Sequence, residues 1–259
     1  MSFTRQEMMA IVAAREIRDG EIVFCGTGIS MVAAMTAKHI SAPNSIIFFE
    51  TGGIDSELRE LPLSVGDPRV MVGTTINAGL AESFAILQNP RTNHRVVAIL
   101  GAAQIDPYGN LNSTCLGDYW HPRMRFPGAG GACDAAAYAG RVMTFMKQER
   151  RRFVSQLAYV SSPGMPRDPE DRRRQGLSLP TNSIVITDMA VFRFSKETGR
   201  MYLWGHYSGV GPEEVRKEVG FPLEINQSRT IPSPTSEELR LLREKIDPLG
   251  LIIKRGKDS

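Results

Sequence analysis

The amino-acid sequence predicts an α/β protein with a mainly parallel sheet flanked by helices. Near its start, an apolar strand at residues 21–25 leads through a glycine turn into a helix at 30–39 and a second strand at 46–49. This order is a βαβ unit, which forms a parallel sheet with a right-handed crossover. Residues 95–100 are almost continuously apolar, as expected for a strand that is covered on both faces.

The remaining elements of the first half follow from periodicity and turn residues. Residues 1–20 are predicted as a helix, because apolar side chains recur at helical spacing and Gly20 can end the helix in a left-handed conformation. Residues 69–72 are predicted as a strand, and residues 81–88 as a helix. The crossover helix at 30–39 ends at a break around Pro43.

The second half contains a long aperiodic segment, residues 101–140, which is rich in Gly, Asn, Asp and Pro. A stretch of this length without periodicity is usually functional. The further predictions are strands at 142–146, 156–160 and 183–187, a mobile surface loop at 163–180, an antiparallel hairpin of 191–194 with 201–204, and helices at 212–219 and 236–245, the last capped by Ser236. We expect one domain, residues 1–259, that ends in this hairpin and these helices.

The composition excludes several function classes. With 31 Lys and Arg against 28 Asp and Glu, the net charge of +3 is too balanced to indicate nucleic-acid binding. The three cysteines lack CxxC spacing and the four histidines are scattered, so we expect neither disulfides nor a metal site. The sequence has no signal-peptide pattern and no apolar run of the roughly 20 residues that a membrane span needs. These features favour a cytoplasmic protein that binds no membrane.

Glu50 is the leading candidate for a reactive residue. It follows the apolar run at 45–49 and precedes Thr51-Gly52-Gly53, so it lies where a buried strand opens into a loop. Ligands of α/β sheets bind at the carboxyl ends of the strands. From its position alone, Glu50 is a nucleophile, a base, a ligand contact or a cap of its loop.

Three further segments compete with or complement Glu50. Residues 26–31 begin like a dinucleotide-binding fingerprint, but Met31 replaces its third glycine, which favours a structural turn or a loop near another ligand. Residues 128–131 are Gly-Ala-Gly-Gly and allow successive amides to point at one anion, although a simple tight turn would use the same residues. Residues 101–114 form a polar loop whose role as support or as ligand contact the composition leaves open.

A carboxylate and a row of free amides can together transfer coenzyme A. The carboxylate attacks a thioester while the amides stabilise the oxyanion, and the released thiolate then attacks the resulting anhydride. The product is an enzyme-bound glutamyl thioester, which a second carboxylic acid can resolve in reverse.

The motifs that carry this chemistry resemble those of the family I CoA-transferases. Residues 49–52 are similar to the Glu-x-Gly motif of that family, residues 128–131 to its glycine-rich loop, and residues 101–114 to the segment between the two. The likeness is greatest to the B (β) subunits of the glutaconate type. It extends to residues 23–28, 64–67, 117–119, 121–122, 147–153, 162–164 and 246–248.

The resemblance implies the CoA-transferase fold and a set of site residues. Glu50 would be the nucleophile, and Gly128, Ala129, Gly130 and Gly131 would form the oxyanion and CoA-binding loop. Apart from the resemblance, we expect Gln104, Asn110, Asn112 and Ser113 either to order the active-site loop or to make structural hydrogen bonds only. The chain would work with an A (α) subunit on an acyl-CoA and a carboxylic acid, with a dicarboxylic acid expected as acceptor. CoA would enter as part of the substrate, without another cofactor.

Other functions remain compatible with the sequence. Relatives on this scaffold include CoA-thioester hydrolases and decarboxylases, in which the glutamate position can hold another residue; Glu50 therefore favours transfer. The chain could also be a non-catalytic partner subunit in which Glu50 only caps its loop. Cys133 is expected to be a packed side chain rather than a nucleophile, and Tyr119 and Trp120 are typical of a core or a subunit interface.

Overall fold

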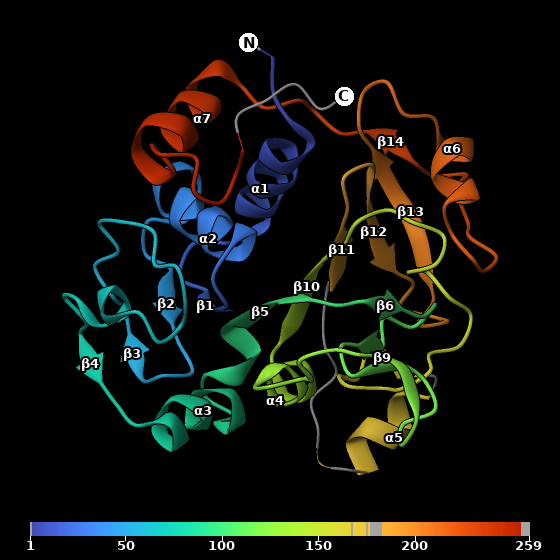
Figure 1. Cartoon of the computed structure of the whole chain (residues 1–259), viewed down its shortest axis with the longest axis horizontal. Coiled ribbons are helices and arrows are strands. Elements are labelled where there is room, and N and C mark those ends of the chain that lie inside the picture. The colour runs from blue at the N-terminus through green and yellow to red at the C-terminus, as the bar shows by residue number, and fades with distance from the viewer. Residues whose placement is uncertain (1, 167, 175, 177–182, 255–259) are drawn as a thin grey trace. The chain divides into compact units, whose positions relative to one another are not determined.

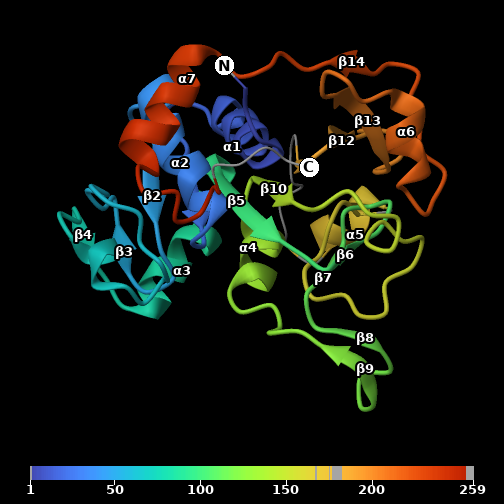
Figure 2. The same ribbon diagram turned by 45° about the horizontal axis from the view of Figure 1, so that its top comes forward.

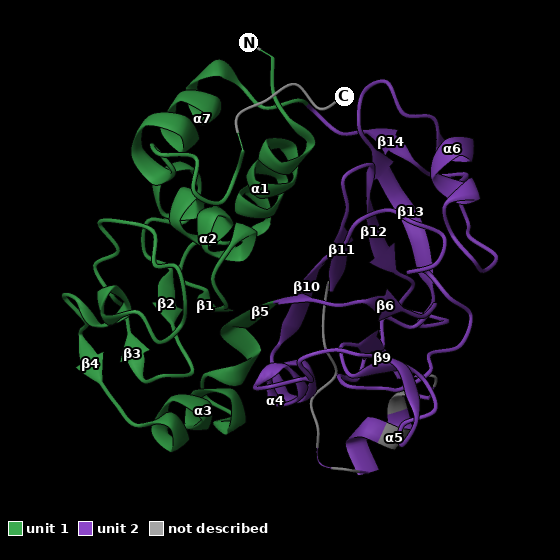
Figure 3. Cartoon of the chain, in the orientation of Figure 1, with its two compact units in different colours: residues 1–99, 233–259 green, residues 100–232 purple. Residues whose placement is uncertain are grey.

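The computed structural model describes residues 2–166, 168–174, 176 and 183–254. The chain falls into two compact units, shown in different colours in Figure 3. Unit 1 consists of residues 1–99 and 233–259, and unit 2 of residues 100–232. The chain therefore leaves unit 1 along a strand and returns to it near its carboxyl end.

The strands of unit 1 include the βαβ core that the sequence predicts. Strand β1 (Ile22–Cys25) pairs in parallel with β2 (Ile46–Phe48) on one side and with β5 (Val96–Gly101) on the other. Beyond β2, the short strands β3 (Gly53–Ile54) and β4 (Ile76–Asn77) add antiparallel pairs (Figure 1). Val23, Ile47 and Val97 are fully buried, so this part of the sheet is covered on both faces.

The helices of unit 1 pack beside this sheet. They are α1 (Arg5–Glu16), α2 (Ile29–Ile40), α3 (Leu80–Gln88) and α7 (Ser236–Leu241), with 3₁₀ turns η1 (Pro68–Met71) and η2 (Asn93–Arg95) and a π-helical turn η3 (Leu242–Ile246) after α7. Helix α1 packs along α2, and α7 with η3 lies on the same layer (Figure 1). The alanine-rich faces of α1 and α2 are buried, because small side chains allow the two helices to approach closely.

Two ion pairs fasten the C-terminal helix to α1. The guanidinium of Arg243 lies 2.6 Å from the buried carboxylate of Glu7, and that of Arg15 lies 2.6 Å from Glu238. Burial acts to raise the pKa of Glu7, but the hydrogen bonds and charge of Arg243 outweigh it, so the pKa lies below its ordinary value. The pKa of Glu238 is lowered in the same way, against burial, by Arg15. Both carboxylates are therefore ionised at neutral pH.

Unit 2 is built on five strands of mixed direction. They are β10 (Arg141–Phe145), β11 (Ile184–Ile186), β12 (Ala190–Phe194), β13 (Met201–His206) and β14 (Arg229–Thr230). Strands β10 and β11 pair in parallel, β11, β12 and β13 pair antiparallel, and β13 and β14 are parallel again. The β12–β13 pair is the predicted hairpin, with the expected connection at 195–200.

Smaller elements of unit 2 fill the segment that lacks periodicity in the sequence. They are two short hairpins, β6 (Gln104–Ile105) with β7 (Leu111–Asn112) and β8 (Cys115–Gly117) with β9 (Pro122–Arg125), followed by α4 (Ala132–Tyr138). Figure 2 shows the β8–β9 hairpin projecting from the rest of unit 2. Helices α5 (Pro169–Arg174) and α6 (Pro212–Lys217) complete the unit.

Two predicted strands are wrong. Residues 69–71 belong to the 3₁₀ turn η1 and Val72 is its C-cap, because Pro68 lacks an amide hydrogen and the carboxylate of Asp67 accepts the amide of Arg69. Residues 156–160 form no strand; Tyr159 lies exposed and stacks on Tyr119, with ring centroids 5.2 Å apart. An apolar run can thus lie on the surface when neighbouring aromatic rings cover part of it.

Two predicted helix ends also differ from the structure. Helix α1 ends at Glu16 with the extended residue Ile17 as its C-cap, and Gly20 takes its left-handed conformation in a separate turn. The N-cap of α7 is Thr235 rather than Ser236, because Thr235 forms a capping box with Glu238. Parts of the predicted surface loop at 163–180, namely 167, 175 and 177–180, lie outside the described residues.

The fold class is confirmed as α/β, with a mostly parallel sheet flanked by helices. Among the described helices, none combines the length and the apolar character that crossing a membrane would require.

Candidate active site

Glu50 lies in a tight turn at the carboxyl end of β2. The strand ends at Phe48, and the amide of Gly52 donates to the carbonyl oxygen of Phe49 at 3.0 Å. Glu50 is therefore the first of the two central residues of this turn, and the chain returns through Gly53, whose carbonyl oxygen accepts the amide of Phe49 at 2.9 Å. The predicted position of Glu50, in a loop just after a buried strand, is confirmed. The strand itself ends at Phe48, one residue before the end that we expected.

The surroundings of Gly52 explain why a glycine is needed two residues after Glu50. Its φ is +104°, and a Cβ added there would lie 1.8 Å from the carbonyl oxygen of Ala78. The backbone of Ala78, just after β4, also donates its amide to the carbonyl oxygen of Gly52 at 2.9 Å. The Glu-x-Gly pattern is therefore a packing requirement of the chain itself.

The backbone of the turn is fixed while the Glu50 carboxylate is not. The hydroxyl of Ser83, in α3, donates to the carbonyl oxygen of Glu50 at 3.1 Å, and that of Thr51 donates to Val65 at 3.0 Å. The side chain of Glu50 is half-buried and makes no hydrogen bond or ion pair with any described residue. A cap of the loop would accept a backbone amide, so this geometry disfavours the capping interpretation.

The glycine-rich loop, residues 128–131, differs from the Glu50 turn in what surrounds it. Gly128 and Gly130 have φ of +101° and +53°, yet no described atom lies within 4 Å of a Cβ added at either residue. The loop therefore needs glycine for its backbone conformation and leaves open space above it. Such space is what the close approach of a ligand or a second chain requires.

Among the four backbone amides of this loop, one donates a hydrogen bond to a described residue and three do not. The amide of Gly128 donates to the carbonyl oxygen of Ser113 at 2.9 Å. The amides of Ala129, Gly130 and Gly131 donate to no residue in the described part of the chain. Gly130 is left-handed and Gly131 is right-handed (φ −74°, ψ −2°), an alternation typical of anion-binding nests. Three successive amides remain available, and Gly128 is not one of them.

The four predicted supporting residues lie in the β6–β7 hairpin and in the turn between β7 and β8. The side-chain amide of Asn112, which is fully buried, donates to Gln104 at 3.0 Å and to Cys115 at 2.7 Å, and its oxygen accepts the amides of Thr114 and Cys115. The side-chain amide of Asn110 donates to the carboxylate of Asp106 at 2.8 Å, and its side-chain oxygen accepts the backbone amide of Gly164 at 2.8 Å. These amide groups are occupied by the protein itself, which favours support over ligand contact.

Ser113 differs from the other three supporting residues. Its backbone amide donates to the hydroxyl of Ser161 at 2.9 Å and its carbonyl oxygen accepts Gly128. Its own hydroxyl has no hydrogen bond to the described residues. Neither Ser161 nor Ser83 is predicted from the sequence, because a lone serine in a polar segment carries no periodic or turn signal.

Glu50 belongs to unit 1, whereas the glycine-rich loop and the four supporting residues belong to unit 2. Within unit 2, the loop is joined directly to the Asn112–Thr114 turn through hydrogen bonds from Gly128 to Ser113 and from Phe126 to Thr114. The structure thus groups the predicted residues into two local arrangements, each with its own bracing.

Other singled-out residues take less reactive positions. Burial raises the pKa of the Cys133 thiol, and the carboxylate of Asp134 raises it further, so the thiol stays protonated at neutral pH. Tyr119 and Trp120 are exposed near the tip of the β8–β9 hairpin, Trp120 by 81%. In this chain they are therefore not core residues. No cluster of three metal-binding side chains occurs in the ranges that the structure describes.

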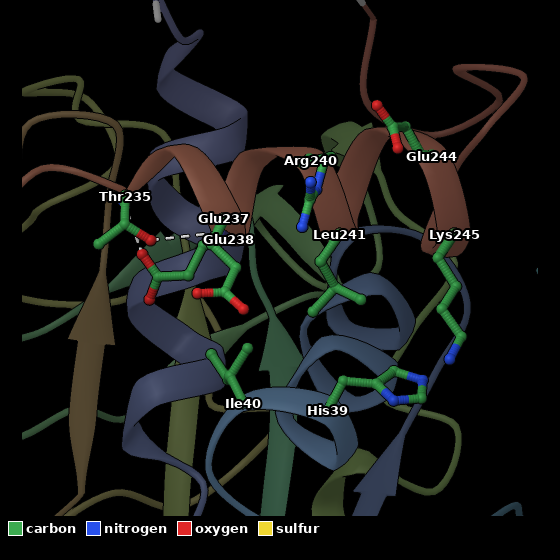
Figure 4. A pocket seen from close by; sticks show the side chains of 9 residues that line it. All are labelled: His39, Ile40, Thr235, Glu237, Glu238, Arg240, Leu241, Glu244 and Lys245. Carbon is green, nitrogen blue, oxygen red and sulfur yellow. Dashed lines mark hydrogen bonds between the residues drawn. The ribbon is translucent and has the colours of Figure 1, made fainter.

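The hollow in Figure 4 contains none of the predicted site residues. It measures about 490 Å³ and is open to solvent between the end of α2 and the α7–η3 segment. Burial lowers the pKa of His39, and the charges of Lys245 and Lys38 lower it further, so the imidazole is neutral at neutral pH. Both signs of charge line the hollow, and Glu238 is already paired with Arg15, so no single ligand chemistry is indicated.

Comparison with known proteins identifies the family. The sequence matches the coenzyme A transferase family over residues 6–218. The chain belongs to this family. It is 38% identical to the B subunit of glutaconate CoA-transferase from Acidaminococcus fermentans over 95% of this chain and 94% of the relative. It is 33% identical to the B subunit of 3-oxoadipate CoA-transferase from Pseudomonas knackmussii over 93% of both chains.

A solved structure agrees with the sequence match. The crystal structure of glutaconate coenzyme A-transferase from Acidaminococcus fermentans superposes with a TM-score of 0.93 and 37% identity, covering 98% of this chain and 99% of the other. The protein is therefore a CoA-transferase chain of the B type, as the motif resemblance indicates. The likeness extends well beyond the three motifs that carry the chemistry.

Proposed function

We propose that this chain is the catalytic B-type component of a heteromeric CoA-transferase, with Glu50 as the nucleophile. The enzyme moves CoA from an acyl-CoA to a carboxylic acid by a ping-pong route. The observation that carries the proposal is the contrast at Glu50 between a backbone held by Ser83 and a carboxylate without a partner among the described residues. A nucleophile needs a fixed position and an unoccupied reacting atom.

The reaction proceeds through two covalent intermediates. A carboxylate oxygen of Glu50 attacks the thioester carbonyl carbon, the carbon–sulfur bond breaks, and CoA leaves as the thiolate. The thiolate then attacks the Glu50 carbonyl carbon of the mixed anhydride and releases the donor acid as a carboxylate. The glutamyl-CoA thioester that results is attacked by the acceptor carboxylate, and the same steps run in reverse to release the new acyl-CoA.

The glycine-rich loop is proposed to supply oxyanion stabilisation. Each addition step places negative charge on a carbonyl oxygen, and amide donors that are already oriented stabilise it strongly. The unused amides of Ala129, Gly130 and Gly131 and the open space above the loop support this assignment. Gly128 would anchor the loop rather than donate to substrate.

The partner and the substrate class follow from the relatives. Both relatives are named as B subunits, which supports an A-type subunit as the partner of this chain. Glutaconate and 3-oxoadipate are both dicarboxylates, so we propose a dicarboxylic acid as the acceptor. The mechanism uses CoA as part of the substrate and calls for neither a metal nor a redox cofactor, so a chelator should leave the rate unchanged.

The test is to trap the glutamyl thioester. The chain is co-expressed with its A-type partner and incubated with an acyl-CoA, for example glutaryl-CoA, without an acceptor. Borohydride then reduces the thioester, and peptide mass spectrometry locates the modified residue. We expect modification at Glu50 that depends on the acyl-CoA, and we expect Glu50→Gln to lose both the modification and transfer, the latter by on the order of 10³-fold or more.

Two results would contradict the proposal in different ways. If acyl-CoA is consumed without modification at Glu50, the enzyme hydrolyses or decarboxylates the thioester, and Glu50 is a base or a structural residue. If Glu50→Gln transfers CoA at the wild-type rate, this chain is a non-catalytic partner. Because the Glu50 side chain makes no described hydrogen bond, Glu50→Gln should unfold at the wild-type temperature, which keeps stability from confusing the result.

A further inference from the structure

Ser161 connects the core of unit 2 to the glycine-rich loop. It is buried, with 9% of its surface exposed, and lies between the surface segment that ends at Val160 and the bridge that Ser162 forms with Leu111. Its backbone amide donates to the carbonyl oxygen of Leu111, in β7, at 2.8 Å. The amide of Leu111 in turn donates to the carbonyl oxygen of Ser162 at 2.9 Å. The backbone of Ser161 is therefore fixed to a strand.

The side chain of Ser161 holds the next turn of the chain. Its hydroxyl oxygen accepts the amide of Ser113 at 2.9 Å and lies 2.6 Å from the hydroxyl oxygen of Thr114. One small side chain thus fixes two consecutive residues immediately before β8. Since the backbone of Ser161 is itself fixed, these two hydrogen bonds transmit its position to Ser113 and Thr114.

Those two residues hold the glycine-rich loop. The carbonyl oxygen of Thr114 accepts the amide of Phe126 at 2.9 Å, and that of Ser113 accepts the amide of Gly128 at 2.9 Å. These two bonds continue the β8–β9 ladder beyond the pair Cys115 and Arg125. The three unused amides begin at the next residue, Ala129.

We propose that Ser161 is a positioning residue for the oxyanion-stabilising amides of the glycine-rich loop. The inference rests on the function proposed above for that loop. Ser161 is linked to the free amides through Ser113 and Gly128, so it acts through them and not on the substrate. Loss of its hydroxyl removes the described acceptor of the Ser113 amide and lets the anchor of Gly128 shift, and donors that stabilise a transition state are sensitive to shifts of about 1 Å.

The chain offers a matched control at the next residue. Ser162 is also buried, at 1% exposure, and its hydroxyl makes no hydrogen bond to any described residue. Ser161→Ala and Ser162→Ala therefore remove the same atom from adjacent buried positions, but only the first change breaks the connection to the loop. Ser161→Thr retains the hydroxyl and serves as the conservative rescue.

The experiment measures steady-state transfer and the rate of Glu50 labelling in the complex with the A-type partner. For Ser161→Ala we expect kcat to fall by about 10-fold, with KM for acyl-CoA within about 2-fold, because the loop donors act on the transition state more than on the bound substrate. Labelling of Glu50 should slow by the same factor. Ser162→Ala should keep the wild-type kcat, and Ser161→Thr should recover most of the lost rate.

The inference is overturned if Ser161→Ala turns over and labels Glu50 at the wild-type rate, or if Ser162→Ala loses as much kcat as Ser161→Ala. If Ser161→Ala does not assemble, Thr114→Val removes one of the two hydroxyl contacts with little change in shape and should show a smaller fall in kcat, again at constant KM. Failure of the proposed function is distinct, because wild-type enzyme would then show no Glu50 label at all.

Discussion

The Glu50 turn and the glycine-rich loop use glycine for different reasons. At Gly52 the chain's own backbone occupies the place of a Cβ, since the carbonyl oxygen of Ala78 would lie 1.8 Å from it. At Gly128 and Gly130 the φ angles are also positive, but the space above them is empty of described atoms. A glycine packed by its own chain indicates a structural requirement, whereas a glycine under open space leaves room for a ligand or a second chain to approach.

The two regions are also braced differently. Glu50 has a fixed backbone and a side chain without described partners, so its freedom lies in the side chain. The glycine-rich loop has its freedom in three backbone amides, and its anchor consists of neutral hydrogen bonds through Ser113 and Asn112. Under the proposed function, the reacting side chain and the oxyanion-stabilising amides thus come from separate parts of the chain, each with its own support.

The largest expected effect tests whether Gly52 is required for the stability of the fold. Gly52→Ala forces a strained φ and a contact with Ala78 that rigid backbone cannot relieve, so we expect a loss of about 3–5 kcal/mol in unfolding free energy. Chemical denaturation of the complex measures it. Gly26→Ala is the matched control, because Gly26 has open space and no positive φ, and it should stay within about 0.5 kcal/mol of wild type. Equal stability of both variants would remove the structural reason for Gly52.

The next largest effect tests whether the open space above the glycine-rich loop is needed for CoA transfer. Gly130→Ala adds a Cβ in the open space above the unused amides, so we expect CoA transfer to fall by about 10- to 100-fold, with only about 1 kcal/mol lost in stability from the left-handed φ. Gly209→Ala is the control, since Gly209 also has a positive φ under open space, in a turn of the same unit. It should show the same stability loss and full activity. Equal activity of the two variants would show that the glycine-rich loop has no particular role in CoA transfer.

The smallest effect concerns the ion pairs that close unit 1. The folded-state pKa values of Glu7 and Glu238 are lowered, so their stabilisation is complete above the ordinary carboxyl pKa and is lost as pH falls through the lowered values. We expect a loss of about 1–2 kcal/mol between neutral pH and about pH 3, measured by denaturation across that range. Glu7→Gln should be less stable at neutral pH and should show a flatter pH dependence. The same slope in both proteins would show that Glu7 carries none of the effect.

Much of the fold follows from local sequence. The β1–α2–β2 unit, strand β5, helix α3 and the β12–β13 hairpin agree with their predicted bounds to within one or two residues, because each has an unbroken apolar pattern and clear turn residues at its ends. The strand wrongly predicted at 69–72 is replaced by a 3₁₀ turn because the two residues directly before it, Asp67 and Pro68, favour a turn more strongly than the apolar pattern favours a strand. The strand wrongly predicted at 156–160 depends on a distant residue, because Tyr159 stacks on Tyr119 at the surface.

The site divides along the same line. The sequence by itself determined the family, the place of Glu50 after a buried strand and the glycines that a left-handed loop requires, because these depend on residue type and short-range order. Only the tertiary structure decided that Ala78 makes Gly52 obligatory, that the amide of Gly128 is occupied by the carbonyl oxygen of Ser113, and that Ser83 and Ser161 hold the two regions. These contacts join residues up to 48 positions apart, and a hydrogen bond between distant residues leaves no local pattern in the chain.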